Sequence, residues 1–245
     1  MTRVSLNLDT NLLIRWLIGL SAVVLLLGYF REGYVALFGL ETPLKDLRQI
    51  ALDTEHCLGS FHSSALMGIS SVLMVILGQQ QGKRWMQLQW YFLALVFALM
   101  SLDESVSFHE VLINPLRPFF AFSDFLHFAW IVPGAFFVLL MGLAYLPFLK
   151  ALDAMTRNRI MLAGGLYVTG ALGMEAVGGH FHAQGGFGHP LYIAAFIVEE
   201  TLETLGLTLF AATLLSLISS YFPRKAKSGS STQHRELHAG IPQPS

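Results

Sequence analysis

The segment from Ser101 to Glu110, with the sequence SLDESVSFHE, concentrates side chains that could perform acid–base or metal chemistry. Its acidic and imidazole groups, all within eight residues, are Asp103, Glu104, His109 and Glu110. They close an otherwise apolar run that begins near Trp85. Ionisable groups at the end of a membrane-length segment are costly to bury, and they indicate a functional site when partners can be found for them.

Two later segments supply such partners. Glu175, His180 and His182 end one apolar run, and Glu199, Glu200 and Glu203 begin the last one. Three carboxylates within five residues repel one another unless protons, basic side chains or a cation neutralise them. Only four basic residues are expected on the same side of the membrane, which is too few to pair every acid. A bound cation is therefore the economical explanation.

The mixture of carboxylate and imidazole groups suits iron, manganese or zinc, whereas all-oxygen sites suit magnesium or calcium. We expect a divalent transition metal, with iron favoured over zinc or manganese and a di-iron-like site as one form. The predicted metal ligands are Glu104, His109, Glu110, Glu175, His180, His182, Glu200 and Glu203. Asp103 and Glu199 are predicted to be catalytic through proton handling and through orienting the imidazoles.

Neither the Glu-x-x-His pair of ferritin-like proteins nor the multiple histidine boxes of membrane desaturases are present, and the sequence suggests no family. An alternative interpretation needs no metal. A single glutamate at a helix N-terminus such as Glu199 is ordinary, because the helix dipole favours it there. Asp103 and Glu104 would then mark only the point at which a helix leaves the membrane. The combined acid and histidine layer favours a functional site.

The composition indicates an integral membrane protein. Hydrophobic residues make up 54% of the chain and charged residues only 13%, whereas soluble domains carry about 25% charged residues. The single cysteine, Cys57, excludes an intrachain disulfide and a thiolate metal cluster. No stretch suggests a nucleic-acid-binding patch. The partners expected are the lipid bilayer and a lipid-like substrate.

The apolar runs predict an all-α, six-helix transmembrane domain over residues 1–222. About 20 apolar residues span the hydrocarbon layer, and the predicted helices cover about 12–39, 58–77, 85–113, 125–149, 160–177 and 191–221. The first helix is expected to be uncleaved, because no small-x-small cleavage pattern follows it. Residues 223–245 are predicted to form a disordered basic tail.

Positive charges give the orientation. If the helices alternate, eleven of the fifteen Lys and Arg residues fall on one side, which places both termini in the cytoplasm and suggests a bacterial inner membrane. Asp103, Glu175 and Glu203 then lie about 24–28 Å from the inner ends of their spans, at about 1.5 Å per residue. This common depth near the outer boundary predicts that the three groups meet.

The favoured hypothesis is a metal-dependent oxidoreductase or hydrolase embedded in the membrane, acting on an apolar or lipid-like substrate. An ion- or proton-coupled transporter is a second interpretation, and it would require ionisable groups to continue toward the cytoplasmic side. A third is a non-catalytic membrane subunit whose acidic outer face docks a partner. Interface acids need neither a shared depth nor a metal.

Overall fold

A computed structural model describes residues 9–39, 46–52, 54, 56–120 and 123–222. The tail 223–245, which was predicted to be disordered, lies outside the described residues. Within the described ranges the chain is helical and contains no strand. The predicted all-α class is therefore confirmed for this part of the chain.

Six helical segments in the described part of the chain are long and apolar enough to span a membrane, as predicted. They are α1 (Thr10–Phe38), α2 (Leu58–Gln79), α3 (Arg84–Val106), α6 (Ile131–Ala151), a composite of α7 (Ala154–Val168), η4 (Thr169–Met174) and α8 (Glu175–Gly185), and α9 (Pro190–Tyr221). Short elements connect them: η2 (Arg48–Ile50), α4 (Phe108–Val111), α5 (Ile113–Phe120), η3 (Asp124–Leu126) and η5 (Gly186–Gly188).

The third predicted helix, 85–113, is interrupted. Helix α3 ends at Val106 because Ser107 adopts a left-handed conformation with φ 58°. Helices α4 and α5 follow as short separate pieces. A non-glycine residue with positive φ costs conformational energy, and hydrogen bonds between Asp103 and His109, which flank Ser107, hold the turn. The break bends His109 back toward Asp103.

The fourth predicted helix, 125–149, begins later, at Ile131 of α6. Pro133 lies in the first turn of α6, where a missing backbone N–H costs nothing. The fifth, predicted as 160–177, begins earlier, because the Asp153 side chain caps α7 by accepting bonds from the N–H groups of Met155 and Thr156, both at 3.0 Å.

The fifth span also runs further than predicted. Its middle piece, η4, is π-helical, and the Glu175 N–H donates to the carbonyl of Gly170, five residues earlier. Helix α8 then continues to Gly185, so most of the stretch 178–190, which lies between the predicted helices 160–177 and 191–221, is helical. Since no proline occurs between Pro147 and Pro190, nothing in this segment prevents the helix from continuing.

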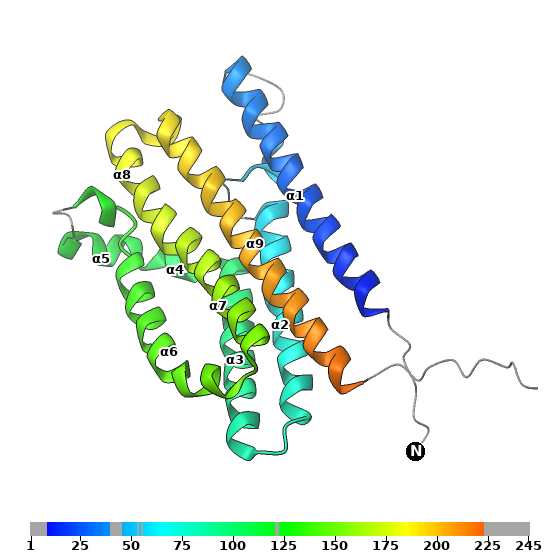
Figure 1. Cartoon of the computed structure of the whole chain (residues 1–245). Coiled ribbons are helices and arrows are strands. Elements are labelled where there is room, and N and C mark those ends of the chain that lie inside the picture. The colour runs from blue at the N-terminus through cyan, green and yellow to red at the C-terminus, as the bar shows by residue number, and fades with distance from the viewer. Residues whose placement is uncertain (1–8, 40–45, 53, 55, 121–122, 223–245) are drawn as a thin grey trace, which may run out of the picture.

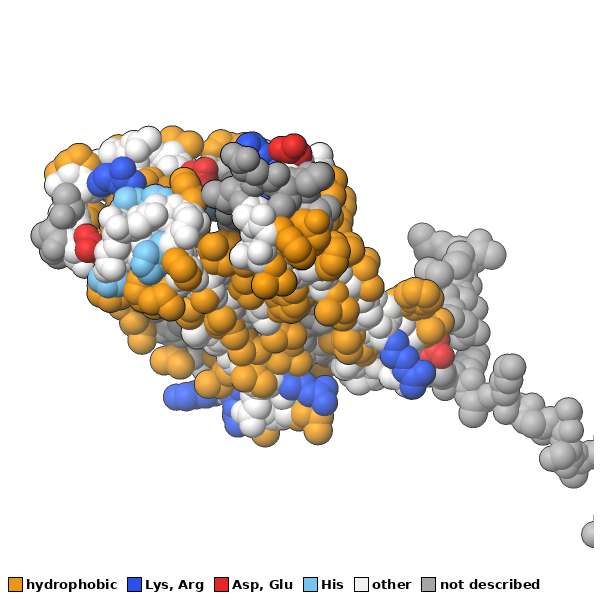
Figure 2. Space-filling model, turned by 90° about the horizontal axis from the view of Figure 1, so that it is seen from above, with side chains coloured by type: hydrophobic (Ala, Val, Ile, Leu, Met, Phe, Trp, Pro, Cys, Tyr) orange, Lys and Arg blue, Asp and Glu red, His pale blue; other side chains and the backbone are white. Residues whose placement is uncertain are grey.

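Helix α9 is the centre of the bundle and packs against α1, α2, α7, η4 and α8 (Figure 1). Helix α3 packs along α2, and α6 lies at the edge next to α7 (Figure 1). We call the end at which α8 joins α9 the outer end, following the positive-inside prediction. Seen from this end, histidine side chains gather in one area beside acidic and basic side chains (Figure 2).

A compact apolar core joins the inner halves of the spans. Trp90 and Phe148 are fully buried and meet edge to face, with ring centroids 5.0 Å apart. By contrast, many large apolar side chains on the periphery are exposed, among them Trp16 at 70% and Phe136 at 62%. An exposed apolar belt of this kind suits contact with lipid rather than water.

Two glycines allow α9 to approach the fifth span closely. A Cβ at Gly206 would lie 2.7 Å from the carbonyl oxygen of Ala163, and one at Gly170 would lie 2.9 Å from the carbonyl oxygen of Glu199. Small residues at such crossings are typical of membrane helices. The Gly170 contact brings η4, and therefore Glu175 directly after it, against the glutamate-bearing turn of α9.

Candidate functional site

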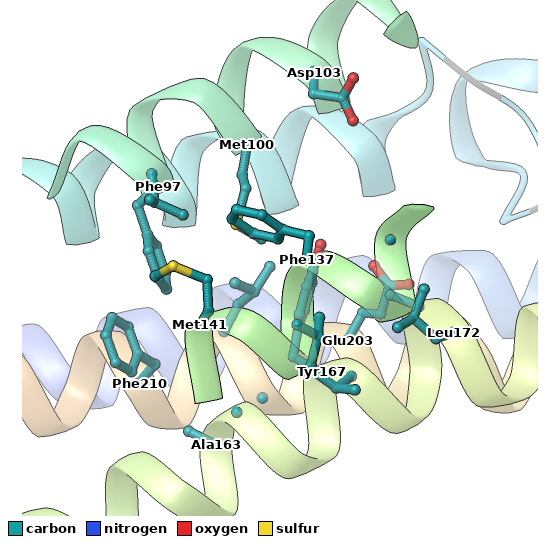
Figure 3. A pocket seen from close by; sticks show the side chains of 18 of the residues that line it. Phe97, Met100, Asp103, Phe137, Met141, Ala163, Tyr167, Leu172, Glu203 and Phe210 are labelled. Carbon is teal, nitrogen blue, oxygen red and sulfur yellow. The ribbon is translucent and has the colours of Figure 1, made fainter. Parts of the chain in front are cut away.

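A cavity of about 580 Å³ lies between α3, α6, the α7–η4 segment and α9. Most of its wall is apolar, and the side chains there include Val96, Phe97, Met100, Phe137, Met141 and Phe210. Figure 3 shows Glu203 toward one end of the cavity and Phe210 toward the other. The cavity is therefore amphipathic along its length, with a polar outer end and an apolar inner end.

Seven of the ten predicted site residues line this cavity. We call them the acid–histidine layer: Asp103, Glu104, His109, Glu175, Glu199, Glu200 and Glu203. They come from α3 and α4, from the start of α8 and from α9. The structure thus brings together side chains from three spans that lie up to 100 residues apart in the sequence.

A second pocket of about 210 Å³ lies on the outer side of the layer. Six residues line both spaces: Glu104, His109, Trp130, Glu175, Glu199 and Glu200. The layer therefore forms the boundary between an apolar cavity within the spans and a pocket at the outer end. Neither set of lining side chains, as far as the chain is described, includes a lysine or an arginine.

Asp103 fixes the orientation of His109. One carboxylate oxygen accepts the His109 backbone N–H at 3.0 Å, and the other lies 2.8 Å from the ring Nδ1. An ionised carboxylate only accepts hydrogen bonds, so Nδ1 carries the proton in this pair. In its neutral form the ring then has its lone pair on Nε2, the atom available to take up a proton or to bind a metal.

Trp130, at the start of α6, connects two members of the layer. Its indole Nε1–H donates to Glu175 Oε1 at 3.3 Å, and its ring centroid lies 4.8 Å from that of His109. Trp130 was not among the predicted site residues. The signal that could have found it is an indole at the outer end of an apolar run, because a buried indole N–H needs an acceptor.

Glu175 and Glu199 are two carboxyl groups of the layer that come from different spans, Glu175 from the start of α8 and Glu199 from α9. Both side chains are partly buried and line both the cavity and the outer pocket.

Tyr167 of α7 also lines the cavity and was not predicted. Figure 3 shows its side chain close to that of Glu203. The sequence offers little to identify it, because a single tyrosine in an apolar helix usually serves packing.

The other three predicted ligands lie elsewhere. Glu110 is exposed and lines only the outer pocket, while His180 and His182 line neither space. In the part of the chain that the structure describes, no three His, Cys, Asp or Glu side chains are already arranged around one point as metal ligands would be. The predicted eight-residue ligand set is therefore not assembled as a whole.

His182 belongs to a separate cluster with His127, which precedes α6. Arg117 Nη2 lies 3.3 Å and His182 Nδ1 3.1 Å from His127 Nε2. Because arginine only donates, His127 Nε2 must accept from both. Burial, and then the positive charges of Arg117 and a protonated His182, lower the pKa of His127, while Asp124 opposes them.

His62 lies away from the layer as well. It is 6% exposed, and its Nε2 lies 2.9 Å from the hydroxyl of Ser21, which also contacts Thr208 Oγ1 at 2.7 Å. This buried network joins α1, α2 and α9. It satisfies polar groups in the bundle interior and does not reach the cavity.

The sequence profile of a domain of unknown function, DUF8692, matches residues 17–217. The chain belongs to this family. The matched region contains every residue of the acid–histidine layer, and the family description names no activity. No curated protein and no solved structure matches the chain.

Proposed function

We propose that this protein is a membrane-embedded enzyme that holds a lipid-like or other apolar substrate in the cavity and transforms it at the acid–histidine layer. The observation that carries the proposal is the placement of seven ionisable side chains, drawn from three spans, at one end of a single apolar cavity. Intramembrane ionisable groups are expensive and are usually retained for function.

The protein's own groups can handle protons at this position. His109, held by Asp103 and facing both spaces, can accept or release a proton at Nε2. Glu175 and Glu199 line the same two spaces as further carboxyl groups, and the Trp130 N–H donates to Glu175. A substrate that reaches the layer from the apolar side therefore meets an imidazole and several carboxyl groups, which are the groups used for general acid–base catalysis.

We further propose a divalent transition metal as cofactor, with iron favoured over zinc or manganese. The ligands would come from Glu104, His109, Glu200 and Glu203, whose donor atoms suit these ions, and Asp103 would orient His109 from behind. Such an ion would polarise the substrate or activate oxygen or water. Since the side chains do not already converge on one point, binding would require the carboxylates to rotate toward one another.

Metal analysis of the purified full chain tests this proposal. We expect about one or more transition-metal ions per chain, and a large loss in the double variant Glu200→Gln and Glu203→Gln. The matched control is Asp46→Asn, an exposed carboxylate that lines neither space, which should keep the metal. A wild-type protein prepared without chelators and found free of transition metal would refute the metal-dependent proposal.

A lipid transporter is the second candidate, and one observation favours it. The cavity wall reaches Leu149 and Ile160, which lie next to the basic residues Lys150 and Arg159 at the inner end. A space of this depth would suit transfer between leaflets. Flux of a labelled lipid across proteoliposomes, lost in Glu203→Gln while no metal is bound, would favour the transporter over the enzyme.

A further inference from the structure

We propose that the ligand of this site is a single-chain amphiphile without an anionic head group, either a long-chain alcohol or a long-chain amine. Its tail would lie in the apolar cavity and its head in the outer pocket, so that the bond next to the head is held at the acid–histidine layer. This inference rests on the proposed function only in taking the cavity as the substrate site.

The length and chemistry of the cavity point to an alkyl or isoprenoid tail. Glu175 at the outer end and Ile160 at the inner end both line it, and they are 15 residues apart. This separation corresponds to about 22 Å along the helix axis. One leaflet of a hydrocarbon core about 30 Å thick spans about 15 Å, so the cavity accommodates a membrane-length chain.

Charge complementarity selects the head group. The outer pocket and the layer are lined by Glu104, Glu110, Glu175, Glu199 and Glu200, and the described linings contain no lysine or arginine. Carboxylates accept hydrogen bonds from hydroxyl or ammonium groups. A phosphate, sulfate or carboxylate head would face these carboxylates, and the described lining offers it no lysine or arginine as a partner; such contacts exclude ligands strongly.

The cavity can be reached from the membrane rather than only from water. Gly142 of α6 and Gly164 of α7 both line it and are also exposed on the surface of the chain. Neither glycine has a neighbouring atom within 4 Å of the position that a Cβ would take. Side-chain contacts therefore do not close the cavity between α6 and α7 at these two positions, which would suit lateral entry of a tail.

Native mass spectrometry of the full chain in a non-ionic detergent tests the head group. Hexadecanol, hexadecylamine and hexadecanoic acid are added at equal concentration and mildly alkaline pH, with and without a chelator. We expect the alcohol and the amine to bind at least about tenfold better than the acid in the chelator-treated sample. Equal binding of the acid in that sample would overturn the head-group assignment.

Two neighbouring glycines test the tail. Gly164→Phe would project a ring into the cavity, whereas Gly165, which also has no atom within 4 Å of its Cβ position, does not line the cavity. We expect Gly164→Phe to lose at least about nine-tenths of the bound alcohol or amine and Gly165→Phe to keep it, since filling a site excludes its ligand. Equal loss or equal retention in the two variants would overturn the placement of the tail.

The outcomes separate this inference from the proposed function. If the protein contains metal but binds the three probes equally, the metal proposal stands and the ligand assignment fails. If the alcohol and amine bind in the cavity of a protein that contains no metal, the ligand assignment stands and the metal-dependent proposal fails.

Discussion

The carboxylate of Asp103 holds His109 at two points, accepting its backbone N–H at 3.0 Å and lying 2.8 Å from its ring Nδ1. Both contacts depend on the left-handed residue Ser107 between them, which ends α3 and reverses the chain locally. A straight helix would separate the two side chains, because residues six positions apart lie on different faces. The helix break therefore creates the acid–imidazole pair.

Replacing Asp103 should weaken the site without unfolding the protein. In Asp103→Asn one oxygen can still accept the His109 N–H, but the charge that favours a proton on Nδ1 is lost. We expect metal affinity or turnover to fall by about 10- to 100-fold, the usual effect of losing a group that orients a ligating histidine. Metal titration and circular dichroism check this together. Unchanged affinity would mean that Asp103 serves only the turn.

The histidines should divide into two groups. His109→Ala is expected to remove most of the bound metal, because His109 lines the cavity and the outer pocket. The double variant of His180→Ala and His182→Ala should retain it, since these residues line neither space. Metal content per chain, measured after identical purification, decides the point. Loss of metal in the double variant, with none in His109→Ala, would instead place the metal site at His180 and His182.

The glycine contacts of α9 should be sensitive to a single methyl group. Gly170→Ala and Gly206→Ala would place a Cβ against backbone atoms, and overpacking of this kind costs about 1–3 kcal/mol. Gly33→Ala in α1 has open space and should be neutral or stabilising by up to about 1 kcal/mol. The free energy of unfolding in detergent compares the three. Similar values for all of them would contradict the close packing.

Acidification should destabilise the cluster formed by Arg117, His127 and His182. The pKa of His127 is lowered in the folded protein, first by burial and then by Arg117 and His182. As the pH falls below 6.5, the unfolded chain binds the proton first, so the stability contributed by neutral His127 is lost as the pH falls further. Protonation of His127 would also end its acceptance of hydrogen bonds from Arg117 and His182.

Thermal unfolding temperature measured across this pH range tests the effect. His127→Gln should flatten the acid side of the profile, whereas His189→Gln, which leaves His127 and its partners in place, should not change it. A profile that is the same in wild type and His127→Gln would show that other groups govern the acid response.

The buried network around Ser21 should contribute to stability. Ser21→Ala leaves the buried His62 Nε2 without the hydroxyl that lies 2.9 Å from it, and an unsatisfied buried polar group costs about 1–3 kcal/mol. Ser220→Ala removes an exposed hydroxyl that bonds to Leu217 O and should change stability by less than about 0.5 kcal/mol. Denaturant titration measures both. Equal effects would indicate that the network is not stabilising.

The spans and the common depth of the acids could be predicted because both depend on the length of apolar runs. The rotation of each side chain around its helix could not. His180 lies five residues after Glu175, about 140° around the helix, which is consistent with its absence from the cavity lining. His182, seven residues on, returns to the same face but lies about 10 Å further along the axis.

The interruption of the third helix at Ser107 could not be predicted either. Nothing in the residue types marks Ser107 as left-handed, because only its hydrogen-bonded neighbours make that conformation stable. Trp130 was missed for a related reason. Its importance comes from its contact with Glu175, which lies 45 residues later in the sequence. A tertiary contact of this kind leaves no local pattern in the sequence.

The π-helical segment η4 has a consequence for Glu175, the first residue after it. Such a segment closes its turn with i→i+5 hydrogen bonds and so holds one residue more than an α-helical turn. One additional residue corresponds to about 100° of rotation about the helix axis. An uninterrupted α-helix would therefore point the Glu175 carboxylate about 100° away from its present direction, so the π-helical segment lets this carboxylate accept the Trp130 indole N–H.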